Sequence, residues 1–418
     1  MTVARPAFFA PFSVRSFRFQ WPADLLASWA FEMEVLILGW YVLVESSSVL
    51  LLVMYGALQY AGSLVSPLFG VAGDRIGYRR LFMITRLLYA LMSILIAVLA
   101  ATHLLTPVLV LVLAGVCGLV KPSDIMMRFA LIAQTLPSNQ MIGALGLSRV
   151  TTDSARIAGA LAGVGVFALF GLVPAYLLVS GLYLVSCMLA SGVATGDPQR
   201  ARATPSTPYQ DLILAFGYVW RKPELLGAFC LAFLVNILAY PLFLGLLPYV
   251  ANNIYDIGQA GLGMLVGSYA TGSLLGSVVV SSNRFAIGPA RLMLLWALCW
   301  FAIDLLFAWV TYLPLGMVLL ASAGFAQNLC LVPLAGVMLK SSDPAYRGRV
   351  MGMRMLAIWG LPTGLMLSGP LINYVGFTVT ASVYSFFGLL LTAAIAIRWR
   401  RELWSRVAAV NTNQQPDR

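Results

Sequence analysis

Long apolar runs divided by short loops, alternately basic and nearly free of charge, constrain the fold of this chain most. We delimit twelve runs, each close to or above the roughly 20 residues that a helix needs to cross a bilayer. The runs are 19–44, 48–72, 81–103, 106–127, 142–168, 171–194, 225–247, 258–282, 291–311, 313–339, 350–373 and 376–398. The sequence therefore predicts an all-α membrane protein with twelve transmembrane helices.

Nearly all of the 26 Lys and Arg residues fall in alternate loops and towards the two ends of the chain. Short loops that carry Lys and Arg stay in the cytoplasm, so this bias fixes the direction of each crossing. In chain order the basic groups are Arg5, Arg15 and Arg18; Arg75, Arg79 and Arg80; Lys121 and Arg128; Arg200, Arg202, Arg221 and Lys222; Arg284 and Arg291; Lys340, Arg347, Arg349 and Arg354; and Arg398, Arg400, Arg401 and Arg406. We predict a multi-pass protein of the bacterial inner membrane with both termini in the cytoplasm.

The composition excludes several classes of protein. The chain is 61% hydrophobic and 10% charged, which is not the composition of a soluble domain. The net charge of +11 is spread over many short loops, so we interpret it as attraction to anionic lipid and not as a nucleic-acid-binding face. The five cysteines lie inside apolar runs and are expected to be packing residues. We expect no cleavable signal peptide, because the first run is long and lacks a small-residue cleavage site.

A polar segment divides the twelve runs into two sets of six. Residues 195–208 are rich in Pro, Thr and Arg, as in a linker, and residues 209–222 have the helical spacing of a membrane-surface helix. Residues 73–81 are echoed weakly by 283–292, and 121–124 by 340–343, in what we take to be matching loops. We therefore predict two pseudo-symmetric six-helix bundles, 1–194 and 223–418, joined by a cytoplasmic linker, 195–222.

The chain lacks the motifs of an ATP pump or a metalloenzyme. None of its three lysines, Lys121, Lys222 and Lys340, ends a phosphate-binding G-x-x-x-x-G-K-[ST] loop. His103 is the sole histidine, which disfavours zinc sites and Ser-His triads. We expect no enzyme activity, no cofactor and no metal, and transport driven by an ion or substrate gradient.

A loop between the second and third runs carries a family signature. Its residues 70–80, G-V-A-G-D-R-I-G-Y-R-R, resemble the G-x-x-x-D-R-x-G-x-R-R motif of the major facilitator superfamily. The matching positions are Gly70, Asp74, Arg75, Gly77, Arg79 and Arg80. The resemblance implies the twelve-helix fold of that superfamily and a loop that latches the inner gate, with Asp74 facing Arg349 or Arg354. We interpret Arg79 and Arg80 as topology charges and favour the latch for Asp74.

Three further stretches narrow the resemblance. Residues 39–48, 155–163 and 347–352 look like the drug and siderophore exporter branch, which includes macrolide-efflux-like and enterobactin-exporter-like transporters. Two departures weaken the proton-antiport interpretation. Ala160 stands where the antiporter motif of the fifth span has Pro, and the fourth span lacks the Arg near its start that often accompanies proton coupling.

The first run holds three acids, Asp24, Glu32 and Glu34. An ionisable group at mid-bilayer costs about 2.5–3.5 kcal/mol, so each needs a reason to be there. At 100° per residue, Glu32 and Glu34 project about 160° apart and cannot both line one cavity. Both are candidates for proton coupling or substrate binding, and a structural acid bonded to a neighbouring helix is the alternative.

The fifth run places Arg149, Asp153 and Arg156 on one helical face. Arg156 is the deepest of them and could bind an anionic substrate or neutralise Glu32, whereas a static salt bridge is favoured for the other two. We expect Arg86 in the third run to extend its charge to the inner surface. Asp304 in the ninth run is expected to be a structural or protonated acid.

Four polar residues lie in the seventh and tenth runs, which by the resemblance line the central cavity. They are Asn236, Tyr240, Gln327 and Asn328. We predict that they form hydrogen bonds with substrate, and polar packing between helices is an equal alternative.

These observations together predict a secondary transporter that exports a small or amphipathic molecule, is coupled to inward proton flow through Glu32, and works by rocking of its two bundles. We expect a monomer whose partners are the substrate, protons and lipid. Two alternatives stay open. One is a lysophospholipid flippase or an uptake facilitator, and the other is a non-transporting membrane sensor on the same fold.

Overall fold

The computed structural model describes residues 7–63, 76–137, 140–194, 208–281, 288–343, 346, 350, 353–354 and 356–404. Within these residues the regular secondary structure is helical throughout. The all-α prediction is confirmed.

The described helices of the first half overlap each of the first six predicted spans. They are η1 (Ala7–Ser13), α1 (Arg15–Ser46), α2 (Val49–Leu58), η2 (Ala61–Ser63), α4 (Tyr78–Ala101), α5 (Pro107–Thr135), α6 (Met141–Ala158), the π-helical η4 (Gly159–Gly163), α7 (Val164–Phe170) and α8 (Leu172–Ala190). Local chemistry sets several of their limits. The Ser48 hydroxyl accepts a hydrogen bond from the Leu51 amide and caps α2. Gly171, at φ +83°, allows the sharp turn between α7 and α8.

The described helices of the second half overlap each of the other six. They are α9 (Pro208–Arg221), α10 (Pro223–Leu238), α11 (Tyr240–Leu244), α12 (Leu247–Tyr249), η5 (Val250–Ile254), α13 (Gln259–Ser281), α14 (Pro289–Phe307), α15 (Leu313–Lys340), α17 (Gly360–Arg398) and α18 (Arg400–Trp404). Gly376, at φ +82°, divides α17 into two spans. Seven helices within the described residues are long and apolar enough to cross a membrane, and four further helical stretches there are apolar but shorter.

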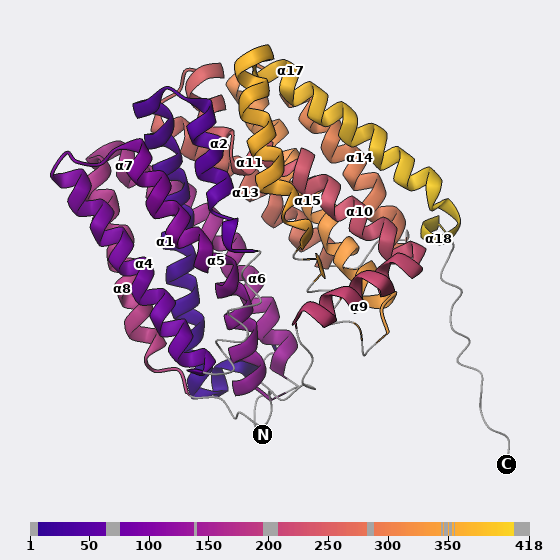
Figure 1. Cartoon of the computed structure of the whole chain (residues 1–418), viewed down its shortest axis with the longest axis horizontal. Coiled ribbons are helices and arrows are strands. Elements are labelled where there is room, and N and C mark those ends of the chain that lie inside the picture. Colours follow the sequence, from indigo (N-terminus) through magenta and orange to yellow (C-terminus); the bar gives the residue numbers. More distant parts are fainter. Residues whose placement is uncertain are drawn as a thin grey trace.

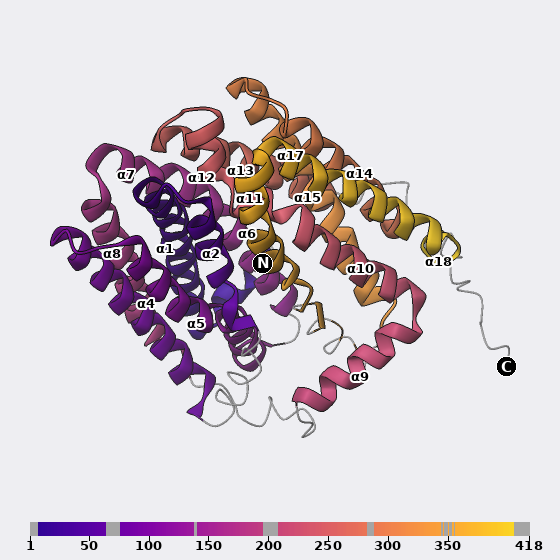
Figure 2. The ribbon, with the colours of Figure 1, turned by 45° about the horizontal axis from the view of Figure 1, so that its top comes forward.

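The helices form two bundles that lie side by side (Figures 1 and 2). α1, α2 and α4–α8 pack on one another, and α10–α15 and α17 do the same. The bundles touch where α2 meets the first half of α17, and where α6, η4 and α7 meet α13. Gly56 of α2 lies against Leu365 of α17, and Gly39 of α1 against Pro248 of α12. These contacts lie towards the end of α1 that is far from η1, and towards the other end the bundle ribbons diverge (Figure 1).

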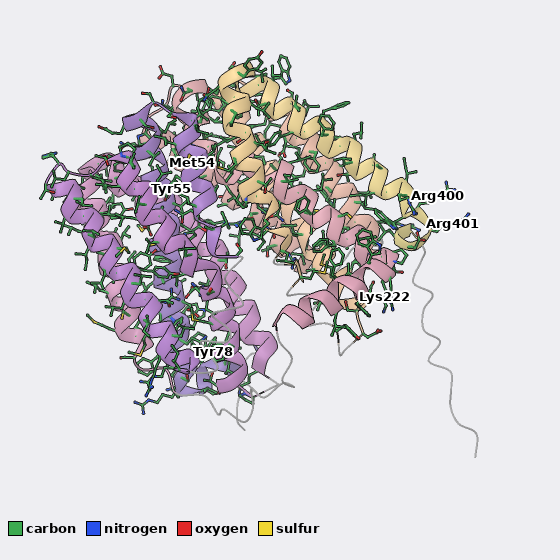
Figure 3. The ribbon with its side chains drawn as sticks, in the orientation of Figure 1. Met54, Tyr55, Tyr78, Lys222, Arg400 and Arg401 are labelled. Atoms are coloured by element: carbon green, nitrogen blue, oxygen red, sulfur yellow. The ribbon has the colours of Figure 1, made fainter. Side chains whose placement is uncertain are left out.

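The predicted surface helix is α9, which crosses below the second bundle (Figure 2). The Tyr218 hydroxyl donates to Asp343 Oδ2 at 2.9 Å, and Lys222 Nζ lies 3.3 Å from Asp343 Oδ1. These contacts fasten α9 to the end of α15, while the side chains of Phe216 and Trp220 stack on the exposed face. Figure 3 labels Lys222 beside Arg400 and Arg401 of α18, at the end of this bundle that is remote from the bend of α17.

One predicted loop is a helix. We expected Lys121 and Arg128 to mark the fourth loop, but α5 continues to Thr135 and contains both residues. The echo between 121–124 and 340–343 therefore does not join two loops, because the first segment lies inside α5 and the second ends α15. Helix α5 continues because its polar side chains find partners on α1, α2 and α4, as described below.

Candidate functional site

Glu32 of α1 and Arg156 of α6 face each other at the centre of the molecule. Glu32 Oε1 lies 3.9 Å from Arg156 Nε, and the two side chains remain 22% and 19% exposed. A close approach of the helices makes this possible. A Cβ atom added at Gly159 would lie 2.6 Å from the Cβ of Glu32, and one at Gly163 would lie 2.5 Å from the Met33 side chain. The π-helix η4 begins at Gly159, so the pair sits beside a widened helical turn of the kind frequent at functional sites.

Residues of both bundles complete the surroundings of this pair. The Tyr60 side chain is close enough to interact electrostatically with Glu32, Arg156 and Tyr240. Gln327 Nε2 donates to the Tyr240 hydroxyl at 2.6 Å, while Gln327 Oε1 is buried with no partner among the described residues. We call Glu32, Tyr60, Arg156, Tyr240 and Gln327 the central cluster. It joins side chains of both bundles, and Tyr60 was missed because an isolated Tyr gives no signal in an apolar run.

Glu34 points away from the central cluster. The Tyr183 hydroxyl of α8 donates to Glu34 Oε2 at 2.9 Å, and the Tyr55 hydroxyl of α2 donates to the Glu34 carbonyl at 3.3 Å. The prediction that Glu32 and Glu34 face different surroundings is confirmed. Glu34 is therefore bonded to the neighbouring helix α8.

Lys121 links the two acids and was not predicted as a site residue. Its Nζ donates to Gln59 Oε1 at 2.8 Å and lies over the Phe31 ring. It is also close enough to attract both Glu34 and Glu32. Gly118 allows α5 to approach α2 closely and so brings Lys121 within reach of Gln59. A Cβ atom at position 118 would overlap the Leu58 carbonyl where the two helices cross. In the sequence, Lys121 stands three residues before Asp124, and we interpreted Lys121 as a charged residue of a loop.

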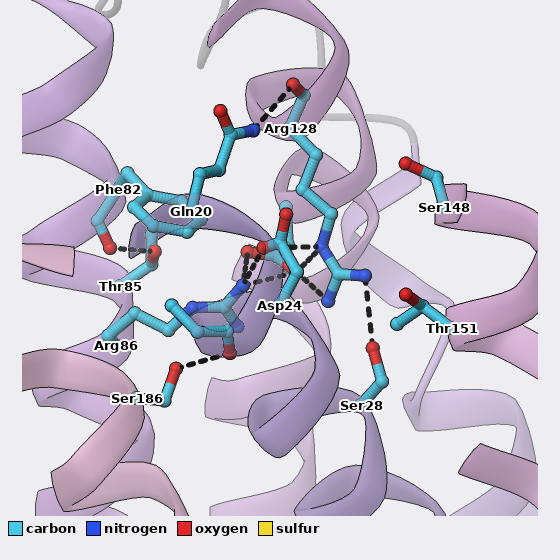
Figure 4. A network of polar contacts seen from close by, with 12 residues as sticks. Gln20, Asp24, Ser28, Phe82, Thr85, Arg86, Arg128, Ser148, Thr151 and Ser186 are labelled. Carbon is cyan, nitrogen blue, oxygen red and sulfur yellow. Dashed lines mark hydrogen bonds and ion pairs between the residues drawn. The ribbon is translucent and has the colours of Figure 1, made fainter. Parts of the chain in front are cut away.

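Four buried charges form an alternating square between α1, α4 and α5 (Figure 4). Arg86 Nη2 lies 2.9 Å from Asp24 Oδ1 and 3.1 Å from Asp124 Oδ1. Arg128 lies 3.2 Å from Asp24 and 2.8 Å from Asp124, and also donates to the Ser28 hydroxyl at 3.0 Å. We call Asp24, Arg86, Asp124 and Arg128 the charge square. The prediction that Arg86 extends to the surface was wrong, because its side chain is 1% exposed and two carboxylates hold it inside.

The other predicted cavity residues have different surroundings. Asn236 Nδ2 donates to the Ala232 carbonyl of its own helix at 2.8 Å. Asn328 is fully buried, and its Nδ2 donates to the carbonyl oxygen and the hydroxyl of Ser273, which ties α15 to α13. Arg149 and Asp153 belong to α6, but their side chains lie outside the described residues.

Part of the predicted gating set lies outside the described residues, namely Gly70, Asp74, Arg75 and Arg349. Gly77 precedes α4 with φ +90°, a conformation that favours glycine. Arg79 Nη2 donates to the Ser191 carbonyl at the end of α8, at 2.6 Å, whereas Arg80 is exposed. Arg354 is half-buried and close enough to interact with Cys330 of α15.

An apolar groove lies where the two bundles meet. Its volume is about 490 Å³, and its lining includes Ile157 and Leu161 of the first bundle and Met264, Thr271 and Met317 of the second. The Thr271 hydroxyl donates to the Gly267 carbonyl of its own helix, so the groove has an apolar character. Ile157 directly follows Arg156, so the groove and the ion pair share α6 but lie on faces about 100° apart.

Comparisons with known proteins agree with this architecture. A family model described as a transmembrane secretion effector matches residues 6–418. The multidrug efflux pump Tap of Mycolicibacterium fortuitum is 26% identical over 405 residues, covering 91% of this chain and 95% of that protein. Among solved structures, the nucleoside transporter NupG has a TM-score of 0.72 at 14% identity, covering 92% of this chain and 98% of that one. A bacterial homologue of the human lysosomal transporter Spinster, inward-facing and unoccupied, has a TM-score of 0.69 at 13% identity, covering 96% and 98%. The chain belongs to the transmembrane secretion effector family of major facilitator transporters.

Proposed function

We propose that this protein exports a small or amphipathic molecule in exchange for protons. The observation that carries the proposal is the Glu32–Arg156 pair, a loose and partly accessible ion pair between α1 and α6 of the first bundle in a transporter fold. The similarity to a multidrug efflux pump supports export as the direction.

The distribution of basic residues supports an orientation with both termini in the cytoplasm of a bacterial cell. With this orientation, the contacts between α2 and α17, and between α6–α7 and α13, lie on the outer side. The arrangement is then inward-facing, with 1–194 and 223–418 as the two rocking units. The latch between Asp74 and Arg349 or Arg354 is part of the same proposal and acts when the inner side closes.

The exchange of substrate for a proton follows from competition between the two at the Glu32–Arg156 pair. As a carboxylate, Glu32 attracts Arg156, and a proton on the carboxyl removes that attraction and frees the guanidinium. Substrate and proton therefore compete for the same pair. Lys121 couples this event to Glu34, because its ammonium is shared electrostatically between the two acids. Tyr240 and Gln327 supply hydrogen bonds from the second bundle, and the roles of Asn236, Asn328, Arg149 and Asp153 stay predictions.

The energy available is adequate for modest export. One proton moving down a potential of about 100 mV supplies about 2.3 kcal/mol, which supports a substrate gradient of roughly 40-fold.

The decisive experiment uses the purified chain in liposomes with an imposed pH gradient and ethidium as probe. Glu32→Gln keeps the side-chain shape but cannot exchange a proton. We expect it to lose gradient-driven accumulation while retaining downhill movement of the dye. Glu45→Gln is the matched control, because Glu45 is an exposed acid on the same helix. If Glu32→Gln still accumulates ethidium in proportion to the gradient, the proton role is wrong.

The apolar groove favours a second candidate, a lysophospholipid flippase. Its volume of about 490 Å³ suits an acyl chain, and its place at the junction of the bundles gives access from lipid. Movement of a fluorescent lysophospholipid that exceeds ethidium transport, and that is blocked by Gly267→Leu, would favour this function. Drug transport with no lipid movement would exclude it.

A further inference from the structure

Asp304 is a buried acid that the proposed exchange at Glu32 does not use. Its side chain is fully buried in α14, and neither carboxylate oxygen has a hydrogen-bond partner among the described residues. The acids of the first bundle differ, because Asp24, Asp124 and Glu32 each lie within ion-pair distance of an arginine. Unsatisfied buried polar groups are rare in native proteins, so each calls for an explanation.

The surroundings of Asp304 supply aromatic rings and one hydroxyl. Trp300 and Phe307 lie on the same face of α14 at i−4 and i+3, and Phe243 of α11 stacks near both. The Tyr269 ring of α13 stacks on Phe243 at 4.8 Å. Its hydroxyl is close enough to interact with Asp304, and it too is buried with no partner among the described residues. The carboxyl group and the phenol therefore share one apolar compartment.

No cation compensates Asp304 from the helices packed around it. α11 and α13 contain no charged residue, and α15 and α17 contain one each, Lys340 and Arg398, at their last positions. On α14 itself, Arg291 stands near the opposite end, and the short helix α18, which also contacts α14, carries Arg400 and Arg401 together with Glu402. None of these groups is close enough to Asp304 to compensate its charge. A bare carboxylate in such a place is costly, and binding a proton removes the charge.

A row of hydroxyl groups leads from Asp304 to the central cluster. Tyr269 is close enough to interact with Asp304 at one side and with Tyr240 and Arg156 at the other. Tyr240 in turn accepts the hydrogen bond from Gln327 and packs edge-on against Trp300, with ring centroids 5.4 Å apart. Phenolic hydroxyls both donate and accept, so they can pass a proton without holding a charge.

We propose that Asp304 is a second proton-binding site, in the second bundle, filled and emptied through the hydroxyl groups of Tyr269 and Tyr240. Because neither Asp304 nor the Tyr269 hydroxyl has a hydrogen-bond partner among the described residues in this arrangement, the site empties only after side-chain movement joins Asp304, Tyr269 and Tyr240 by hydrogen bonds. The carboxyl proton then passes to the Tyr269 oxygen while Tyr269 gives its own proton to Tyr240, and Tyr240 gives one to water at the central cluster. One proton moves, and a carboxylate remains. The inference rests on the proposed proton-coupled export and adds one proton to each cycle.

The test measures how many protons accompany each substrate. The purified chain in liposomes exports ethidium against a gradient, with the membrane potential clamped at zero and the pH difference varied. The limiting accumulation of the dye rises about 100-fold per pH unit for two protons and about 10-fold for one. We expect the steeper dependence for the wild type and the shallower one for Asp304→Asn, which is nearly isosteric. Asp256→Asn is the matched control, because Asp256 is an exposed acid, and it should keep the steeper dependence.

Infrared difference spectra of the same protein across pH 5–9 give a readout that is independent of transport. Asp304→Asn should lose one protonated-carboxyl band that Glu32→Gln retains. A wild-type slope and an unchanged band in Asp304→Asn overturn the inference. If Asp304→Asn does not fold, Tyr269→Phe replaces it in the transport assay. Loss of the Tyr269 hydroxyl should give the shallower dependence of ethidium accumulation on the pH difference. A dependence equal to that of the wild type again overturns the inference. Failure of the proposed exchange at Glu32 would be seen separately, because Glu32→Gln would then still accumulate ethidium in proportion to the pH gradient.

Discussion

Removing Arg86 from the charge square should destabilise the protein more than removing any exposed arginine. In Arg86→Met an unbranched side chain is kept, the guanidinium is removed and the charge is lost. Asp24 and Asp124 then share Arg128 as their cation, although each was within about 3 Å of the Arg86 guanidinium. Two carboxylates are left to repel each other in a compartment from which water is excluded.

The magnitude follows from these distances. At 2.9 and 3.1 Å and an effective dielectric constant of about 20, each contact is worth about 5–6 kcal/mol of attraction before desolvation is subtracted. Desolvation of the arginine offsets much of this. Loss of one partner from a buried pair typically costs 3–5 kcal/mol, and we expect Arg86→Met to fall in that range. The double variant Arg86→Met/Asp24→Asn removes one charge of each sign, so it should recover about 2 kcal/mol of that loss.

The assay is the thermal unfolding midpoint in one detergent at a fixed scan rate, because membrane proteins of this size commonly unfold irreversibly. Arg221→Met, on the exposed side of α9, is the control and should change the midpoint little. A midpoint for Arg86→Met equal to that of the control would refute the reasoning. Strictly additive effects of Arg86→Met and Asp24→Asn would show that the square is not an energetic unit.

Two further predictions concern packing and pH. Gly159→Ala should cost about 1–3 kcal/mol and impair transport, because the new Cβ would lie 2.6 Å from the Cβ of Glu32, and thermal unfolding together with ethidium export checks this. Hydrogen bonding from Tyr218, aided by Lys222, lowers the pKa of Asp343, and hydrogen bonding with Tyr218 and Asp343 raises the pKa of Lys222. The contribution of Asp343 to the stability of the α9 contact is present above its unfolded pKa of about 3.9, and it is lost as pH falls through the folded pKa. The contribution of Lys222 is present below its unfolded pKa of about 10.4, and it is lost as pH rises through the folded pKa. Protease protection of α9 should therefore be constant from pH 5 to 9, and a transition within that range would contradict the assignment.

The fold could be predicted from the sequence because an apolar run of about 20 residues has few alternatives to a membrane-spanning helix. The divergence of Glu32 and Glu34 could also be predicted, because it depends only on the 100° rotation between helical residues. Local geometry of this kind needs no knowledge of which helices are neighbours.

Contacts between helices could not be predicted in the same way. Arg86 lies 62 positions from Asp24 and 38 from Asp124, and no local pattern shows that α1, α4 and α5 converge there. Lys121 was predicted to mark a loop from the alternation of basic loops, and only the partners supplied by Gln59 and Phe31 explain its place inside α5.

Gln327 and Asn328 show the same limit at finer scale. Both amides were predicted to line the cavity, but neighbouring helical residues point about 100° apart. Gln327 faces Tyr240, whereas Asn328 bonds to Ser273 between α13 and α15. Which of two adjacent amides faces the centre depends on the rotation of α15 about its axis, and packing against α13 and α14 determines that rotation.

The placement of charge differs between the bundles, and this difference has a mechanical consequence. In the first bundle, eight described charges sum to zero, namely Asp24, Glu32, Glu34, Asp124, Arg86, Lys121, Arg128 and Arg156. Their partners lie on α1, α4, α5 and α6 of the same bundle, so rocking this bundle as a rigid body separates no opposite charges. The second bundle carries Asp304 with no compensating cation among the described helices around it. A change of charge at Asp304 is therefore not neutralised by a neighbouring side chain of the described helices, and it can bias the position of one bundle relative to the other.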